Sequence, residues 1–418
     1  MTSPRTRLRD ADPARWRMLA LLAVAELLGM SLWFAGNAVA PMLRAQWHLT
    51  ESQVAWLTTS VQLGFVAGTA VSALLNLADL VPSAPLFGAS ALLGAAANAA
   101  LLTAGSLPVA IATRFATGVC LAGVYPPAMK MAATWFRTKR GVAIGTVVGA
   151  LTIGKALPYL VHAIPGAGER PVVLVASASA TLAACVVLFA YRDGPYPFPR
   201  RPFAWGLVAA VVHGRRWRLA MGGYLGHMGE LYSFWTWIPS FVAASLVAHA
   251  GGPEAVSAHV DSVSSLLAFL IIAIGGIGCV WGGIVADRIG RERLVTIAML
   301  VSGACALLVG LTFGRSLWLL APVALAWGFF VIADSAQFSV LVTETVPPHA
   351  VGTALTLQTS LGFLLTTVTI QIVPPMVAWV GWRWAFPMLA VGPAFGIWSI
   401  RRLVAANAEV VETDRVTR

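Results

Sequence analysis

The feature that most restricts this sequence is a series of long apolar runs separated by short polar loops. Each run is about as long as the ~20 apolar residues that a helix needs to cross a bilayer. The runs lie near residues 17–40, 53–76, 84–105, 107–129, 141–162, 171–191, 218–246, 263–286, 294–313, 316–341, 350–373 and 383–400. A soluble chain of 418 residues could not hide a composition that is 58% hydrophobic and 11% charged. We therefore predict an all-α membrane protein with twelve transmembrane helices.

Composition and motifs exclude several other classes of protein. A net charge of +11 could suggest nucleic acid as a partner, but the basic residues are scattered over loops between apolar runs. The sequence has neither a G-x-x-x-x-G-K-S/T loop for ATP nor an H-E-x-x-H zinc motif. His227 and Glu230 could both ligate a metal, but two ligands make a weak site. We predict that the protein is not an enzyme, has no cofactor and binds no nucleic acid.

A polar, proline-rich segment at 192–217 divides the runs into two sets of six. A short repeated motif indicates a duplication, because Arg-Trp-Arg lies at the start of both the first run, at 15–17, and the seventh, at 216–218. Two related halves are typical of transporters. The predicted domains are an N-terminal six-helix bundle at 1–191, a cytoplasmic linker at 192–217, a C-terminal six-helix bundle at 218–400 and a cytoplasmic tail at 401–418.

The loops differ strongly in their content of Lys and Arg. If the N-terminus is cytoplasmic, the cytoplasmic segments hold 22 of these residues and the external loops hold four. Cytoplasmic loops of membrane proteins accumulate Lys and Arg, so both termini are predicted to be cytoplasmic. The predicted location is the inner membrane of a bacterium, as a multi-pass protein and as a monomer.

The loop between the eighth and ninth runs reads Gly283-Ile-Val-Ala-Asp287-Arg288-Ile-Gly290-Arg291-Glu292-Arg293. It resembles the G-x-x-x-D-R-x-G-R-R/K signature of the major facilitator superfamily, with Glu292 where a basic residue is usual. The resemblance implies two pseudo-symmetric six-helix bundles and a gating role for this loop. The implied gating residues are Gly283, Asp287, Arg288, Gly290 and Arg291, together with Asp79, which holds the matching place after the second run.

Two other stretches carry a resemblance to the same superfamily. Arg114-Phe-Ala-Thr-Gly118 resembles its R-x-x-x-G element of helix 4, in which the Arg is often tied to proton or substrate coupling. The stretch 125–141 (Tyr-Pro-Pro-Ala-Met-Lys and onward) resembles the helix 4–5 junction of nitrate/nitrite and cyanate-type porters. Nitrate porters carry a Gly- and Asn-rich signature on helices 5 and 11, and Asn is absent from the corresponding runs here.

Six ionisable residues lie inside the apolar runs, where each costs ~2.5–3.5 kcal/mol to insert unless it faces a cavity or a partner. They are Glu26, Arg114, Lys155, His227, Glu230 and Asp334. The third, sixth, ninth and twelfth runs contain no such residue within their spans, since Arg383 at the start of the twelfth is counted with the external loop. In the superfamily that the sequence resembles, those four helices are peripheral and the others surround a central cavity. We therefore predict that the six residues serve substrate or proton coupling.

The roles of the acidic residues remain open at this stage. A low-dielectric cavity favours the protonated form of a carboxyl group, so Glu26, Glu230 or Asp334 could exchange protons. His227 and Glu230 share a helix face and could form one coupled site. Alternatively, Glu230 pairs with an Arg or Lys across the cavity and only fixes geometry. A structural role is favoured for Glu26, and an interhelical hydrogen bond for Asp334.

Arg114 and Lys155 each have two interpretations, and contact with a substrate or counter-ion is favoured for Lys155. Either they bind an anionic substrate, or they form permanent salt bridges with acids such as Glu26. Glycines spaced along the fifth run, from Gly141 to Gly154, predict close helix approach there. Uncharged candidates for the lining of the cavity are Asn37, Gln62, Tyr232, Trp235 and Gln358.

The function predicted from these residues is secondary active transport by alternating access, coupled to protons. The first candidate substrate is a small organic or inorganic anion. An alternative is a proton-driven exporter of multiple drugs or hydrophobic compounds, suggested by the aromatic content and the acidic groups. A third reading is a membrane receptor that transports nothing. The predicted partners are the solute, protons and the lipid bilayer.

Overall fold

The structure is a computed structural model that describes residues 13–75, 77–137, 139–196, 204–252 and 258–416. Every regular element in these ranges is a helix. Eleven helical segments among the described residues are long and apolar enough to cross a membrane. The prediction of an all-α membrane protein is therefore confirmed.

Among the described residues, the N-terminal half contains ten α-helices before the polar segment at 192–217. They are α2 (Ala14–Met30), α3 (Ala35–Ala38), α4 (Ala40–Trp47), α5 (Glu51–Leu74), α6 (Leu77–Leu80), α7 (Ser83–Ala99), α8 (Leu107–Leu121), α9 (Tyr125–Ala133), α10 (Arg140–His162) and α11 (Glu169–Ala190). A short helix, α12 (Trp205–His213), follows within that polar segment. The C-terminal half continues with α13 (Arg215–His249), α14 (Ala258–Ile289), α15 (Arg291–Leu308), α16 (Leu317–Ala333), α17 (Ser335–Thr345), α18 (Val351–Val380), α19 (Trp382–Ala385) and α20 (Val391–Val416).

The first of the twelve predicted runs is a broken helix, which explains why eleven segments rather than twelve meet the length requirement. Helix α2 has 17 residues and ends at Met30. The chain then makes turns at residues 31–34 and resumes as α3 and α4. The fourth and tenth runs are also interrupted, at residues 122–124 and at Asp334. Each interruption leaves backbone groups without their helical partners, and such groups need other partners inside a membrane.

Two segments that were predicted as a linker and a tail are partly helical. Helix α12 lies inside the predicted linker and packs against α18 and α13. The last membrane helix, α20, continues to Val416 and so includes most of the predicted tail at 401–418. The apolar periodicity could not place these helix ends, because polar residues continue a helix as readily as apolar ones once it leaves the membrane.

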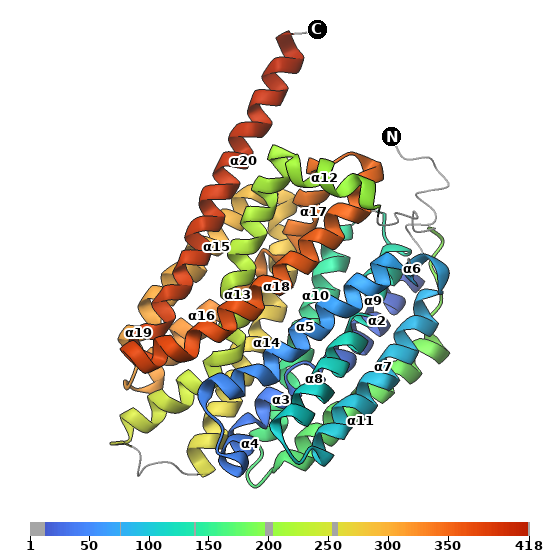
Figure 1. Cartoon of the computed structure of the whole chain (residues 1–418). Coiled ribbons are helices and arrows are strands. Elements are labelled where there is room, and N and C mark those ends of the chain that lie inside the picture. Colours follow the sequence, from blue (N-terminus) through green and yellow to red (C-terminus); the bar gives the residue numbers. More distant parts are fainter. Residues whose placement is uncertain (1–12, 76, 138, 197–203, 253–257, 417–418) are drawn as a thin grey trace.

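The helices of the two halves lie side by side (Figure 1). Helices α5, α7, α8 and α11 lie on one side and α13, α15, α16 and α20 on the other, with α10 and α14 between them (Figure 1). Helix α12 lies at one end of the bundle, and α3 and α4 lie at the other. We call these the α12 end and the α4 end.

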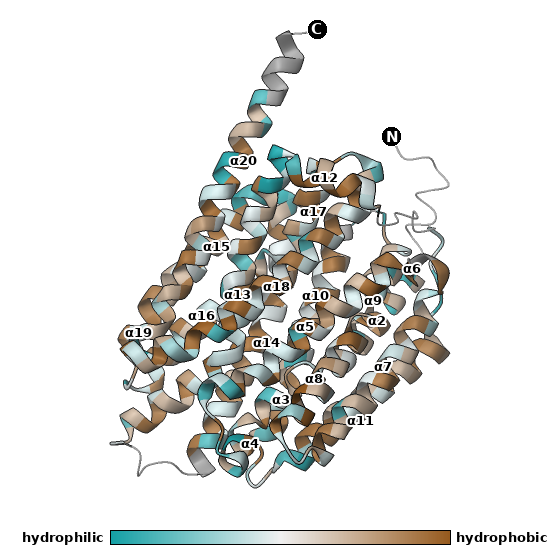
Figure 2. Cartoon of the chain, viewed as in Figure 1, coloured by the Kyte–Doolittle hydropathy of each residue, from teal (hydrophilic) through white to brown (hydrophobic). Residues whose placement is uncertain are grey.

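The outer surface of the bundle is strongly apolar. Figure 2 shows hydrophobic residues along most of the length of the helices and hydrophilic residues gathered toward the two ends. Large apolar side chains face outward, and Phe189 and Trp318 are 86% and 89% exposed. Exposure of this kind is costly in water and favourable against lipid. The outer surface therefore fits the hydrocarbon region of a bilayer.

The two halves meet mainly where α10 packs on α14 and α5 packs on α18. Glycines bring the first pair into backbone contact: a Cβ added at Gly149 would lie 2.6 Å from the carbonyl oxygen of Gly276. A Cβ at Gly145 would lie 2.8 Å from the carbonyl oxygen of Cys279. The close approach predicted for the fifth run is confirmed, and its partner is the eighth run.

This contact predicts the effect of a larger side chain. Gly149→Leu should lower the melting temperature of the purified protein in detergent by several degrees, because overpacking costs about 1–3 kcal/mol. The matched control is Gly105→Leu, since a Cβ at Gly105 meets nothing within 4 Å. Equal melting temperatures for the two variants would contradict the tight α10–α14 contact.

Candidate functional site

A cavity of about 390 Å³ opens between the two halves at the α4 end. Its lining comes from α3, α4 and α10 of the N-terminal half and from α13, α14 and α19 of the C-terminal half, with part of α5. The polar residues along it include Asn37, His162, Thr236 and Asp261. We call this cavity the vestibule. Its position between the halves makes it the candidate entry for a solute.

Two polar contacts lie at the rim of the vestibule. His162 at the end of α10 and Ser265 on α14 form a hydrogen bond of 2.7 Å that joins the two halves. Arg44 on α4 forms an ion pair with Glu51 at the start of α5. Because these contacts are partly exposed, they shape the entrance without closing it.

A cluster of buried aromatic rings lies next to the vestibule. Trp33 packs against Phe65, Tyr232 and Phe363, with ring centroids 5.2, 5.8 and 5.7 Å apart. Tyr232 and Trp235 pack edge to face on α13. Thr236, which follows Trp235 directly in the sequence, lines the vestibule. Rings from both halves thus close the path from the α4 end.

Lys155 of α10 places its ammonium group among three of these rings. Its Nζ lies 3.9 Å from the centroid of Trp33, 4.6 Å from that of Tyr232 and 5.2 Å from that of Trp235. The Nζ also donates a hydrogen bond to the hydroxyl oxygen of Tyr232. Ring faces attract cations within about 6 Å, most strongly when water is excluded. We call these three rings the aromatic cage.

Glu26 of α2 is the acidic residue that interacts electrostatically with Lys155. Its side chain is completely buried, and neither carboxylate oxygen has a hydrogen-bond partner among the described residues. Glu26 and Lys155 influence each other electrostatically, although no ion pair within 4 Å joins them in the described part of the chain. Gly154 brings the two helices together, because a Cβ there would lie 2.1 Å from the carbonyl oxygen of Leu27.

Arg114 of α8 is also completely buried, but its guanidinium group is engaged differently. It donates to the carbonyl oxygens of Leu32 and Trp33, at 2.9 and 2.5 Å, and to Asn98 Oδ1 at 2.7 Å. The two carbonyls belong to the interruption between α2 and α3. Arg114 therefore stabilises the break in the first run and makes no ion pair with a described acid.

Asn98 was not among the residues predicted for the site. It lies on α7, is completely buried, and donates from Nδ2 to Ser177 Oγ and the carbonyl oxygen of Val173 on α11. It thus links Arg114 to a third helix. The signal that could have found it is a single strongly polar residue inside the apolar run at 84–105.

The ionisable residues of the C-terminal half form two separate sets of contacts. His227 Nδ1 on α13 lies 3.0 Å from Asp334 Oδ1, at the break between α16 and α17. Glu230 accepts hydrogen bonds from Trp327 Nε1 at 2.7 Å and Ser302 Oγ at 2.9 Å. The charged partner of His227 is therefore Asp334 and not Glu230. Glu230 is held by neutral donors, so the pairing with an Arg or Lys considered above is not found among the described residues.

The predicted cavity-lining residues divide into two groups. Asn37 lines the vestibule and accepts a hydrogen bond from Thr58, whereas Tyr232 and Trp235 belong to the cage. Gln62 and Gln358 are buried, and their side-chain amides have no hydrogen-bond partner among the described residues. The last four residues are therefore closed off from the vestibule in this conformation.

The predicted gating loop forms the turn between α14 and α15 at the α12 end. Gly290 adopts a φ of +92°, which favours glycine, and α15 begins at the next residue. Arg291 pairs with Glu344 of α17 at 2.9 Å, while Arg288 is exposed. The side chain of Asp79 is outside what the structure describes.

At this same end the halves are in direct contact. A Cβ at Gly283 would lie 2.8 Å from the carbonyl oxygen of Gly141, and one at Gly141 would lie 3.3 Å from Asp287 Oδ2. Asp287 thus faces the first turn of α10. The halves are therefore in backbone contact at the α12 end, while the vestibule opens at the α4 end.

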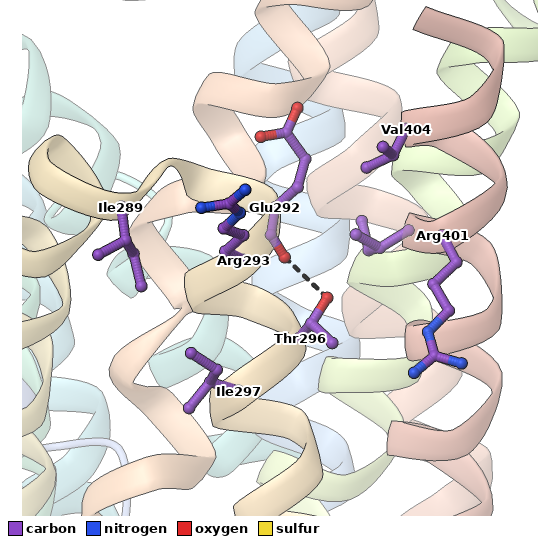
Figure 3. Close-up of a pocket in the computed structure, with 8 residues that line it drawn as sticks. Ile289, Glu292, Arg293, Thr296, Ile297, Arg401 and Val404 are labelled. Carbon is purple, nitrogen blue, oxygen red and sulfur yellow. Dashed lines mark hydrogen bonds between the residues drawn. The ribbon is translucent and has the colours of Figure 1, made fainter. Parts of the chain in front are cut away.

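A second cavity, of about 510 Å³, lies away from the junction of the halves. Figure 3 shows it between α15, which provides Glu292, Arg293 and Thr296, and α20, which provides Arg401 and Val404. The surface that lines it is mostly apolar and belongs to the C-terminal half alone. Because it does not lie between the halves, we do not place the solute path there.

The contacts of Arg114 predict its effect on stability. Arg114→Gln should lower the melting temperature of the purified protein, because leaving a buried acceptor unpaired costs about 1–3 kcal/mol. The control is Arg170→Gln, at an exposed arginine in the first turn of α11. Thermal unfolding in detergent checks this, and a stable Arg114→Gln protein would show that Arg114 does not hold the break.

Comparison with known proteins gives a family for this arrangement. The family model of the Major Facilitator Superfamily matches residues 21–370. The glycine betaine/proline/ectoine/pipecolic acid transporter OusA of Dickeya dadantii is 25% identical over 207 residues, which is 46% of this chain and 40% of that protein. The MFS-type transporter hasB of Aspergillus fumigatus is 32% identical over 108 residues, 25% of this chain and 23% of that protein.

These matches are partial and distant. The chain aligns with less than half the length of either relative. Neither relative is named as a nitrate, nitrite or cyanate porter. The resemblance of residues 125–141 to that branch therefore gains no support from them.

Proposed function

This chain belongs to the Major Facilitator Superfamily, and we propose that it moves a small charged solute across a bacterial inner membrane by proton-coupled alternating access. Its membership makes it a multi-pass secondary transporter of small solutes. In our proposal both termini are cytoplasmic, so the vestibule at the α4 end opens to the outside. The two halves would then rock about their shared interface to open the α12 end.

The observation that carries the proposal is the arrangement of Glu26 and Lys155 next to the closed end of the vestibule. Both side chains are buried, and neither carboxylate oxygen of Glu26 has a hydrogen-bond partner among the described residues. A buried carboxylate without a partner is costly, so Glu26 needs either a proton or a nearby cation. If a solute moves the Lys155 ammonium away from Glu26, the carboxylate loses its nearby cation and takes up a proton instead. Solute binding and proton binding are linked in this way.

A small anion is the first candidate solute from the sequence, and the contacts of Arg114 weaken the support for it. Both terminal nitrogens of the Arg114 guanidinium are already engaged, Nη2 with carbonyls of the break in the first run and Nη1 with Asn98, so Lys155 is the better placed cation for an anion. The alternative of a hydrophobic or cationic solute is favoured by one observation, the aromatic cage around Lys155. OusA is named for glycine betaine, proline, ectoine and pipecolic acid, which are zwitterions. Glycine betaine and proline are therefore the first probes.

Uptake into proteoliposomes tests the coupling. A panel of labelled glycine betaine, proline, nitrate, lactate and tetraphenylphosphonium covers zwitterions, anions and a hydrophobic cation. The wild-type chain should accumulate at least one of these solutes when a pH gradient of one polarity is imposed, and a protonophore should abolish the accumulation. Glu26→Gln should still exchange the same solute across the membrane but should no longer accumulate it.

The matched control is Glu51→Gln, at a carboxylate of the vestibule rim whose partner is Arg44. This variant should keep its response to the gradient, because its carboxylate does not act on Lys155. Uptake that ignores the gradient in the wild type, or that responds equally in Glu26→Gln, would refute the coupling.

A further inference from the structure

Lys155 occupies a site whose chemistry suits a different cation. Three ring faces, from both halves of the molecule, surround its Nζ within 5.2 Å. Such cages are used to recognise quaternary ammonium groups, which are larger and less hydrated than a lysine ammonium. Trp33 comes from the interruption of the first run, and Tyr232 and Trp235 come from α13.

We propose that the aromatic cage is the binding subsite for the ammonium group of the solute, and that Lys155 fills it only while the transporter is empty. The solute is a small zwitterion of the betaine type, with a quaternary or tertiary ammonium and a carboxylate. On binding, its ammonium takes the place of Nζ, and the displaced Lys155 pairs with its carboxylate. This inference rests on the proposed transport function and adds the class of solute.

The charge of the site favours a zwitterion over an ion of either sign. The site contains one cation, Lys155, and one acid that acts on it, Glu26. A simple cation in the cage would leave two positive charges beside one negative charge among side chains that are buried from solvent. A simple anion would draw Lys155 out of the cage and leave the rings empty. A zwitterion adds no net charge and satisfies both the rings and the lysine.

The surroundings provide access and support for the exchange. Tyr159, one helical turn beyond Lys155 on α10, lines the vestibule, and so does Thr236, the neighbour of Trp235. The vestibule volume of about 390 Å³ lies within the range of small-molecule sites. Arg114 is a positioning residue, since its hydrogen bonds to the carbonyls of Leu32 and Trp33 fix the wall of the cage that Trp33 forms.

A competing explanation is that Lys155 is a permanent structural link between the halves. Its Nζ on α10 does contact Tyr232 of α13, so removal of such a link would weaken the protein and improve no binding. An internal occupant of the cage behaves in the opposite way. Its removal must increase the affinity for any other cation that fits the rings.

Binding measurements on the purified chain separate the two explanations without any need for transport or protons. Three probes are used: glycine betaine, its uncharged-carbon isostere 3,3-dimethylbutanoate, and tetramethylammonium, which lacks the carboxylate. Tryptophan fluorescence reports binding, because Trp33 and Trp235 form the cage. Wild type should bind glycine betaine at least tenfold more tightly than either of the other probes.

Lys155→Gln should reverse part of this preference. Tetramethylammonium should bind this variant at least tenfold more tightly than it binds the wild type, while the advantage of glycine betaine over tetramethylammonium should disappear. Tetramethylammonium binding that does not improve, or an isostere that binds the wild type as tightly as glycine betaine, would overturn the proposal.

A second variant decides the question if Lys155→Gln does not fold. Tyr232→Phe keeps the ring and removes only the oxygen that accepts the Nζ hydrogen bond. It should bind glycine betaine several-fold more tightly than the wild type, because Lys155 leaves the cage more easily; an unchanged or weaker affinity would contradict the exchange. Loss of gradient-driven uptake with these affinities intact would refute the proton coupling alone.

Discussion

The central constraint on this structure is how the ammonium group of Lys155 is stabilised although the side chain is buried from solvent. Such a group requires an anion, oriented dipoles or ring faces nearby. Lys155 has three ring faces and one hydroxyl oxygen, while Glu26 acts on it without a hydrogen bond. The strongest available interaction, a direct ion pair, is therefore not made. Because Lys155 is not held in an ion pair with a described residue, it is free to form one with a bound solute. A direct salt bridge to Glu26 would have to break first.

Two other buried ionisable side chains, Arg114 and Asp334, contact or lie at interruptions of the membrane helices. Arg114 binds the carbonyls freed where the first run breaks, and Asp334 lies at the break of the tenth run against His227. Broken helices are tolerated inside a membrane only when other groups satisfy the backbone or the break lies within protein. The first break also has a chemical consequence, because it places Trp33 over Lys155.

Much of this arrangement can be predicted from the sequence, and the limits have physical causes. Hydropathy predicts the helical spans, and the cost of burying charge singles out Glu26 and Lys155 as residues to examine. Spacing along one helix indicates only which side chains share a face, so it suggested a His227–Glu230 pair where the partners come from α15, α16 and the break at Asp334. Hydropathy also does not reveal the turns at residues 31–34, because they interrupt an apolar run without changing its composition. The part played by Asn98 depends on that break and could not be read from spacing alone.

The most direct test of this account is the position of Lys155 Nζ in an experimental structure with glycine betaine bound. In the structure described above, Nζ lies 3.9 Å from the centre of the Trp33 ring. The account predicts that the trimethylammonium group takes that place and that Nζ moves to the carboxylate of the solute. A bound solute elsewhere, with Nζ still over Trp33, would contradict it.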